Sequence, residues 1–185
     1  EISDAEFDEL VKQLKILHPE STALKQVGSP VSSKDKIQHR KVMGSLSKVH
    51  DTNWLKDREK VLCYPKLDGI SIEIVYERGI AVQASSRGDG KFGENLINHV
   101  RKMKCNNLQS NFSGVLYGEM IMRISVFNEK YSKDYANPRN LVAGISHRLD
   151  AFGAEDCEVR FFDGDLGEFS LAVKSISTLE DFLCP

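Results

Sequence analysis

The stretch Lys66-Leu67-Asp68-Gly69-Ile70-Ser71-Ile72-Glu73-Ile74-Val75-Tyr76 decides the fold at the centre of this chain. From Ile70 onward the apolar residues alternate with Ser71 and Glu73, a pattern typical of a half-buried strand. Glu77-Arg78-Gly79 predicts a turn, with Gly79 at the position that needs positive φ, and Ile80–Ser86 predicts the returning strand. The sequence therefore predicts an antiparallel hairpin that begins just after Lys66.

Lys66 is a candidate nucleophile because of its neighbours in the sequence. An ordinary exposed lysine titrates near ~10.4 and is protonated at neutral pH, so it attacks nothing. The apolar residues on either side of the motif, Val61-Leu62 and Ile70, predict a partly desolvated lysine with a free amine lone pair. We expect Asp68 to orient that amine or to hold a metal ion. The alternative is a plain turn with a solvated surface lysine.

Composition limits the classes of protein to which the chain can belong. Its 185 residues are 41% hydrophobic and 28% charged, with a net charge of −2, which is ordinary for one globular domain and argues against a generally basic nucleic-acid coat. No apolar run approaches the ~20 residues that span a bilayer, and no signal peptide is visible, so no membrane partner is expected. The four cysteines lack a Cys-x-x-Cys pair and the histidines are scattered, so no metal site is predicted. We expect reduced thiols and a cytoplasmic protein, or one in a host-cell cytoplasm if a phage or virus encodes it.

Further elements follow from caps, periodicity and glycine content. In the first half of the chain they are a helix that follows the Ser3/Glu6 capping box and ends before Pro19, a linker over 20–35 and a helical stretch over 54–60. In the second half they are a glycine-dense loop over 87–94 that leads to a helix through Arg101, a strand over 115–123, a helix from Asn137-Pro138 to about Arg148, a strand over 159–163 and a last short helix that follows Ser177. Strands and helices mix without strict alternation. The fold class predicted is therefore α+β, with mostly antiparallel sheets and flanking helices.

Three further stretches suggest chemistry around Lys66. Arg87 opens the glycine loop, where its guanidinium could hold a phosphate or a ribose oxygen. Glu119 lies in an apolar strand, where a carboxylate is costly unless it is paired or binds a ligand. Asn137-Pro138-Arg139 begins a capped helix that could cradle an anion. The alternatives stay open: a structural Arg87–Glu119 ion pair, a solvated loop, a plain cap, and Glu94 as a favourable charge at a helix start.

Together these motifs resemble the adenylation (nucleotidyltransferase) domain of NAD-dependent DNA ligases of the bacterial type. The matching segments, in order, are Ile2-Ser3-Asp4-Ala5-Glu6-Phe7-Asp8, Ser45-Leu46 after His39, Lys66-Leu67-Asp68-Gly69, Ser86-Arg87-Gly88-Asp89-Gly90 with Gly93-Glu94, Tyr117-Gly118-Glu119, and Ala136-Asn137-Pro138-Arg139-Asn140 with Ala143-Gly144. The resemblance implies a nucleotidyltransferase (ATP-grasp-like ligase core) architecture that is incomplete at the C-terminus. It also implies a remnant of the nicotinamide-binding segment over 1–30 and a partial adenylation domain over 36–185.

The resemblance implies a role for each matching residue. Lys66, assisted by Asp68, attacks the α-phosphate of NAD, which leaves a lysyl–AMP intermediate. AMP then passes to the 5′-phosphate of nicked double-stranded DNA, with Mg²⁺ neutralising phosphate charge. The residues implied to bind the dinucleotide are Ser45, Leu46, Tyr64, Arg87, Glu119, Asp4 and Asp8, and those implied in the later steps on DNA are Arg139, His147 and Arg148.

The chain also departs from the family pattern. Tyr64 stands where the family has a glutamate that contacts adenine, and His147 stands where it has an arginine. In the family, two later strands each carry a lysine that neutralises the α-phosphate, and these strands are not among the residues of this sequence. We therefore expect a second ligase subunit, or a continuing chain, to supply them together with an OB-fold.

Two other interpretations remain open. The first is a non-catalytic relative that binds nucleotide or DNA, which Tyr64 and the missing lysines favour. The second is an ATP-using ligase or a capping-type guanylyltransferase with the same lysine chemistry, against which the Ile2–Asp8 segment argues.

Overall fold

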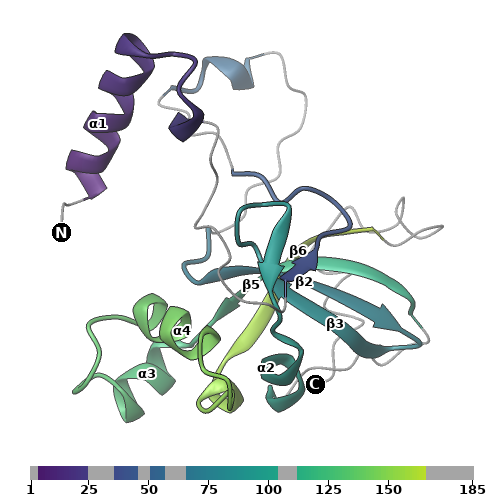
Figure 1. Ribbon diagram of the computed structural model, residues 1–185. Helices are drawn as coiled ribbons and strands as arrows, with labels where there is room; N and C mark the ends of the chain where they lie inside the picture. Colours follow the sequence, from purple (N-terminus) through teal and green to yellow (C-terminus); the bar gives the residue numbers. More distant parts are fainter. Residues whose placement is uncertain (1–3, 25–35, 46–50, 57–65, 104–111, 166–185) are drawn as a thin grey trace.

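The computed structural model describes residues 4–24, 36–45, 51–56, 66–103 and 112–165 (Figure 1). The elements in chain order are α1 (Asp4–Leu17), η1 (Thr22–Leu24), β1 (Lys36–Gln38), η2 (Asn53–Leu55), β2 (Ile70–Glu77), β3 (Ile80–Ser86), β4 (Phe92–Glu94), α2 (Ile97–Lys102), β5 (Gly114–Ile121), α3 (Ile124–Lys130), α4 (Pro138–Ser146), η3 (Ala154–Asp156) and β6 (Glu158–Asp165). The described part is thus a mixture of helices with antiparallel sheets, as the sequence predicted.

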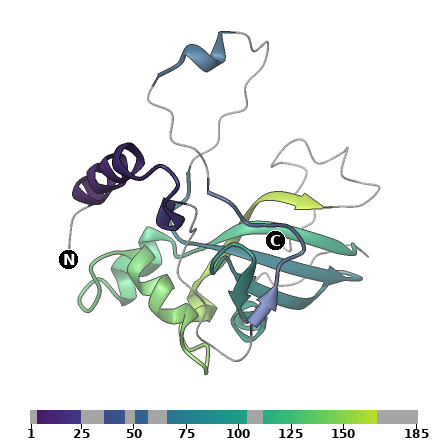
Figure 2. The same ribbon diagram turned by 45° about the horizontal axis from the view of Figure 1, so that its top comes forward.

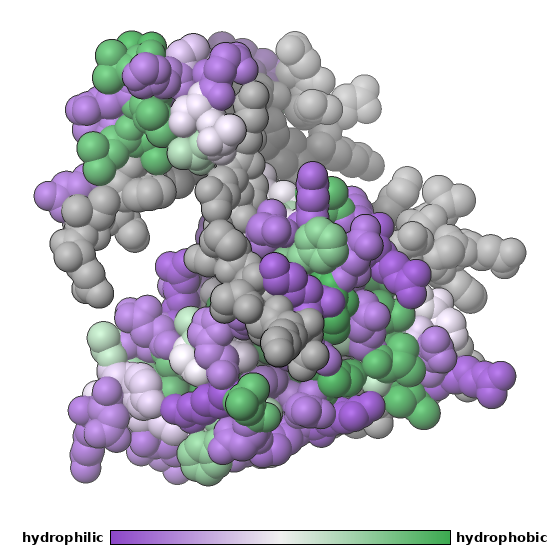
Figure 3. All heavy atoms as spheres, viewed as in Figure 1, coloured by the Kyte–Doolittle hydropathy of each residue, from purple (hydrophilic) through white to green (hydrophobic). Residues whose placement is uncertain are grey.

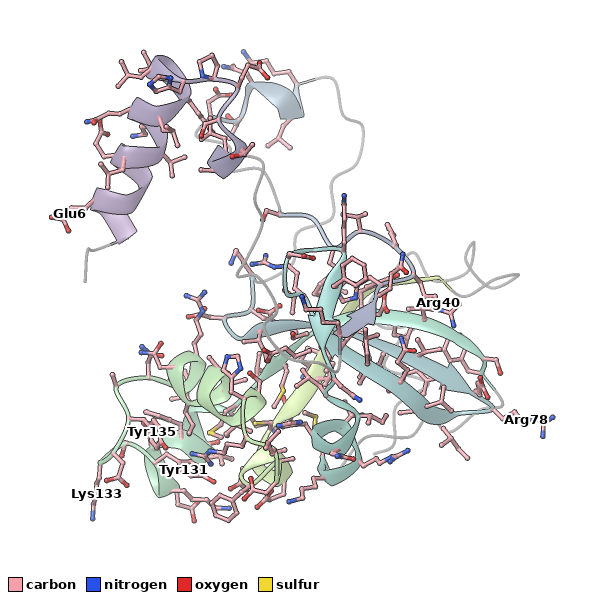
Figure 4. All side chains as sticks on the ribbon, viewed as in Figure 1. Glu6, Arg40, Arg78, Tyr131, Lys133 and Tyr135 are labelled. Atoms are coloured by element: carbon pink, nitrogen blue, oxygen red, sulfur yellow. The ribbon has the colours of Figure 1, made fainter. Side chains whose placement is uncertain are left out.

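The central element is a four-stranded antiparallel sheet in the order β3-β2-β5-β6. The predicted hairpin forms β2 and β3. Its turn places both Arg78 (φ 51°) and Gly79 (φ 79°) in the left-handed region, the conformation that matches the twist of a two-residue hairpin. The side chain of Arg78 extends away from the sheet at this turn (Figure 4).

One face of the sheet carries the main core. Ile72, Ile74 and Tyr76 of β2 point to this face and are almost fully buried. They share one cluster with apolar side chains of α4 such as Leu141 and Ile145. Helices α2, α3 and α4 supply the rest of this layer, so we call it the helix face. Burial of its large side chains at about 1.5–3 kcal/mol each is the main source of stability for the sheet.

The opposite face is covered by the segment 36–45 rather than by helices. Met43 of this segment packs with Val75, Val115 and Tyr117, which form a second, smaller cluster. The segment is tied down by the antiparallel pairing of β1 with β4 and by the bond from Met43 N to Gly90 O at 2.9 Å. Figure 2 shows the strip of chain with β1 lying over the sheet. We call this side the site face.

Some predicted boundaries need correction. The strand predicted over 115–123 is β5 and ends at Ile121, because the chain turns there into α3, a helix that the sequence reading missed. The helix predicted over 54–60 is a single 3-10 turn at Asn53–Leu55 within the described part, and 57–60 lie outside it. The last helix predicted behind Ser177 also lies outside the described residues.

The N-terminal helix α1 agrees with its predicted periodicity. It contacts η1, and in both ribbon views α1 stands apart from the four-stranded sheet (Figures 1 and 2). Several of its apolar side chains, including Leu10, Ile16 and Leu17, are exposed, and hydrophobic surface gathers there in Figure 3. None of the helices in the described part is both long and apolar enough to cross a membrane.

Candidate functional site

A row of polar residues crosses the site face of the sheet from strand to strand. In the ladder Ser71 lies opposite Glu119, and Glu119 lies opposite Arg160. Arg87 continues the row beyond β3, because its N–H donates to Ser71 O at 3.0 Å. The antiparallel register therefore brings the predicted ligands Arg87 and Glu119 onto one face, separated by a single strand.

Glu119 connects this row to the lysine motif. Its carboxylate accepts from Gly69 N at 3.2 Å and from Ser71 Oγ at 2.9 Å. The ion pair between Arg87 and Glu119 that the sequence left open is not found in the described part of the chain. The carboxylate instead holds the backbone that follows Lys66. A hydrogen bond to a charged group of this kind contributes about 1.5–3 kcal/mol.

Gly69 allows the motif to lie this close to β5. A Cβ at this position would overlap the backbone carbonyl of Met120, so only glycine fits without a shift of the strand. The close approach that Gly69 permits is therefore to the protein's own strand β5.

The prediction of a desolvated Lys66 is wrong for the described structure, in which Lys66 is exposed. The physical reason is its place in the chain. Strand β2 begins only at Ile70, so Lys66 has not yet entered the sheet. Residues 57–65, which precede it directly, lie outside the described residues.

Helix α4 meets the lysine motif through an ion pair. Asn137 caps the helix as predicted, because its side chain accepts from Asn140 N at 2.8 Å. In the first turn, Arg139 Nε lies 3.4 Å from Asp68 Oδ1, and both side chains are largely exposed. Such an exposed pair adds little stability, but it shows that Asn137-Pro138-Arg139 and Lys66-Leu67-Asp68-Gly69 lie side by side.

At its other end α4 reaches the glycine loop. His147 Nδ1 lies 2.9 Å from Glu94 Oε2. Glu94 was predicted as a favourable charge at a helix start. It lies instead in β4, three residues before α2 begins at Ile97, and it pairs with His147. The two ends of α4 thus contact the lysine motif, through Asp68, and strand β4, through Glu94.

Hydrogen bonds fix the side chain of Arg148 next to α4. Its guanidinium donates to Phe152 O and to the hydroxyl of Tyr135, each at 2.9 Å. Tyr135 stacks edge-on against Tyr131, and Figure 4 shows the two rings together beside α3. The Tyr131 hydroxyl in turn donates to Asp156 at 2.7 Å. These contacts give Arg148 a structural role whatever its part in the later steps on DNA.

The remaining predicted residues are described in part or not at all. Ser45 is exposed at the end of the segment 36–45. Asp4 and Asp8 belong to α1, but their side chains lie outside the described residues, as do Leu46 and Tyr64 altogether. Their assignment to dinucleotide binding therefore stays a prediction.

The sequence reading missed a buried polar group at the centre of the site face. Glu73 is fully buried on β2, and His39 lies above it with 8% of its surface exposed. The signal for Glu73 was present, since it is a carboxylate inside an apolar strand. His39 was named only as the residue before Ser45-Leu46, and nothing in its own neighbourhood indicated that it faces a strand 34 residues later.

In the described part of the chain we find neither a reactive cysteine nor a group of metal ligands. Burial raises the pKa of the Cys157 thiol to about 12, so this cysteine is an unreactive core residue. The described residues contain no group of three or more side chains arranged to hold a metal ion.

Comparison with known proteins identifies the family. The chain matches the family described as the NAD-dependent DNA ligase adenylation domain over residues 30–183. It is 34% identical to a DNA ligase of Sorangium cellulosum, covering 88% of this chain and 29% of that protein. It is 32% identical to a DNA ligase of Campylobacter hominis (98% of this chain, 32% of that protein) and 35% identical to one of Wolbachia pipientis wMel (88% and 27%). The chain thus spans about a third of the length of these relatives.

Proposed function

The chain belongs to the NAD-dependent DNA ligase adenylation domain family, and from this we propose that it carries the nucleotidyl-transfer step of an NAD-dependent DNA ligase. One observation carries the proposal beyond the family match. Glu119 accepts hydrogen bonds from the backbone of Gly69 and the side chain of Ser71, so this strand carboxylate lies directly beside the lysine motif.

In the proposed reaction the Lys66 amine attacks the α-phosphorus of NAD. The amine loses a proton, a P–N bond forms, and the bond from that phosphorus to the bridging oxygen breaks, so that nicotinamide mononucleotide leaves. Lys66 is exposed in the described structure. The dinucleotide itself must therefore supply the desolvation that frees the amine.

The proposed contacts follow the row on the site face. Arg87 and Glu119 would bind the ribose or a phosphate from the two sides of β2. Ser45 would frame the nucleotide, together with Leu46 and Tyr64. Asp4 and Asp8 of α1 would bind the nicotinamide half.

Later steps would use helix α4. Arg139 lies beside Asp68 and presents a largely exposed guanidinium, which suits a phosphate of nicked double-stranded DNA. His147 and Arg148 would support this contact from the other end of the helix. AMP would then pass to the 5′-phosphate, and the 3′-hydroxyl would displace it.

Magnesium is part of this proposal as an aid to phosphate chemistry. Mg²⁺ commonly binds through one or two carboxylates and the substrate phosphates rather than in an all-protein cage. Asp68 fits this mode, because 75% of its side chain is exposed and its ion-pair partner is itself on the surface. The ion would neutralise charge on the phosphates.

The finer architecture is also a proposal. We expect a nucleotidyltransferase core over 36–185 and a nicotinamide-binding helical segment over 1–30. Because the chain spans about a third of its relatives, we propose that nick sealing needs further elements, supplied by a second subunit or by a longer chain. A cytoplasmic setting fits this activity.

The test is covalent transfer from NAD. The chain is incubated with NAD and Mg²⁺, alone and with the remaining part of a relative's ligase, and the intact protein is weighed. We expect a gain of one AMP that Lys66→Ala abolishes and that the control Lys133→Ala, on the surface turn after α3, leaves unchanged. ATP in place of NAD should give no adduct. An adduct that persists in Lys66→Ala would contradict the assignment.

A non-catalytic relative is the second candidate, and the exposure of Lys66 favours it. In that case the chain binds NAD or AMP without forming a covalent adduct, even when the remaining part of a ligase is supplied. Binding measured by calorimetry beside the mass experiment separates the two functions.

A further inference from the structure

A buried acid lies beneath the segment that covers the site face. Glu73 is on β2 between Ser85 of β3 and Tyr117 of β5, and its side chain has no exposed surface. A buried carboxylate is costly unless other groups compensate it. The groups that do so come from the segment 36–45.

Glu73 holds this segment at two successive residues. Arg40 N donates to Glu73 Oε2 at 3.0 Å, and His39 Nδ1 lies 3.7 Å from Glu73 Oε1. Within the described part of the chain, Oε1 has no hydrogen-bond partner. The distance to His39 is too long for a hydrogen bond, so the second contact is an ion pair when His39 is protonated.

The other nitrogen of His39 holds the start of the glycine loop. His39 Nε2 lies 3.0 Å from Arg87 O, and because a carbonyl only accepts, Nε2 carries a proton. Nδ1 faces Ser85 Oγ at 3.3 Å as well as Glu73. One imidazole therefore connects the covering segment to β2, to β3 and to the backbone of Arg87.

The surroundings of His39 favour its charged form. Burial lowers the pKa of His39, but the carboxylate of Glu73, the carbonyl of Arg87 and the carboxylate of Asp89 together raise it above its ordinary value. Gly93 of β4 completes the enclosure, because a Cβ there would press on the imidazole and on the Ser86 carbonyl. The titratable groups that face His39 are thus Glu73 from β2 and Asp89 from the glycine loop.

We propose that His39 and Glu73 are positioning residues, whose buried ion pair fixes the segment 36–45 and the backbone of Arg87 against the sheet. Ser45 belongs to that segment and Arg87 opens the glycine loop, so the pair sets the relative position of two proposed nucleotide contacts. This inference rests on the proposed function, since it assumes that both residues contact the nucleotide.

It follows that the affinity for nucleotide should depend on whether His39 is protonated. As pH rises through the raised pKa, His39 becomes neutral and its attraction to Glu73 is lost, while the bond to Arg87 remains. The segment 36–45 is then held less firmly. We expect affinity for AMP to fall roughly threefold or more between about pH 6 and about pH 9, since a coupling of half a pKa unit corresponds to a change of about threefold.

The experiment follows the imidazole and the nucleotide separately. The protonation of His39 is titrated by NMR in the full chain, with its signal assigned by its absence in His39→Gln. AMP affinity is measured by calorimetry over the same pH range. Glu73→Gln keeps the shape of the side chain and removes its charge, and His18→Gln, an exposed residue outside the site, is the matched control.

We expect Glu73→Gln to lower the pKa of His39 and to weaken the pH dependence of AMP affinity to the part that the AMP phosphate itself contributes, and His18→Gln to change neither. A neutral His39 at all pH values in the unmutated chain would overturn the inference, and that result needs no variant to fold. So would an unchanged affinity profile in folded Glu73→Gln, or the absence of AMP binding. If AMP binds with this profile but no covalent adduct forms, the proposed catalysis fails and the positioning pair stands.

Discussion

The two faces of the four-stranded sheet are made by alternate residues of the same strands, yet they meet different demands. On the helix face Ile72, Ile74 and Tyr76 exclude water and pack against helices. On the site face their neighbours Ser71 and Glu73 are polar and are held by hydrogen bonds and an ion pair. The comparison teaches that one strand can supply a stable core and a polar site at once, because its side chains alternate in direction.

The largest effect on stability is expected on the helix face. Ile74→Ala should lower the free energy of unfolding by about 2–5 kcal/mol, because it leaves a cavity in a fully buried position. Urea denaturation measures this loss. The control is Ile80→Ala on the edge strand β3, which is 59% exposed and should change the free energy by less than about 0.5 kcal/mol. Equal losses in the two variants would contradict the assignment of the faces.

A smaller loss is expected from the site face. Glu119→Ala removes the acceptor for Gly69 N and Ser71 Oγ and should cost about 1–3 kcal/mol in unfolding free energy. Unlike Ile74→Ala, it should also abolish formation of the AMP adduct in protein that is still folded, as judged by circular dichroism. A folded Glu119→Ala variant with normal adduct formation would show that this carboxylate is only structural.

The smallest effects on stability are expected from two buried histidines whose pKa values are shifted in opposite directions. Burial lowers the pKa of His99, which is beside the helix face and bonded to Ile145 O, whereas the pKa of His39 on the site face is raised. His99 therefore stabilises the fold above its ordinary pKa of about 6.5 and loses that contribution as pH falls through its lowered value. His39 contributes below about 6.5 and loses its contribution as pH rises through its raised value.

Unfolding free energy measured against pH tests this pair of signs. His39→Gln should flatten the curve above about pH 6.5, and His99→Gln should flatten it below about pH 6.5. Flattening on the same side in both variants would refute the contrast between the two faces.

Sequence reasoning predicted what local pattern determines. The alternation from Ile70 gave β2, Gly79 gave the turn, and Asn137-Pro138 gave the capped start of α4. The family motifs also pointed to Lys66, Asp68 and Arg139, and the described structure joins Asp68 and Arg139 in an ion pair.

What sequence reasoning missed depends on contacts between distant parts of the chain. The pairing of His39 with Glu73 needs the segment 36–45 to cross the sheet, and no local signal encodes that crossing. Glu94 and His147 are far apart in sequence and meet only because the fold brings the C-terminal end of α4 to strand β4. The exposure of Lys66 likewise depends on where β2 begins, not on the hydrophobicity of its neighbours.

The most direct test of the central claim is to locate the adenylyl group. The chain is reacted with NAD and Mg²⁺ in the presence of the remaining part of a relative's ligase, digested, and mapped by peptide mass spectrometry. The account predicts AMP on the peptide that contains Lys66 and on no other peptide. AMP on a different residue, or no adduct while NAD still binds, would contradict it.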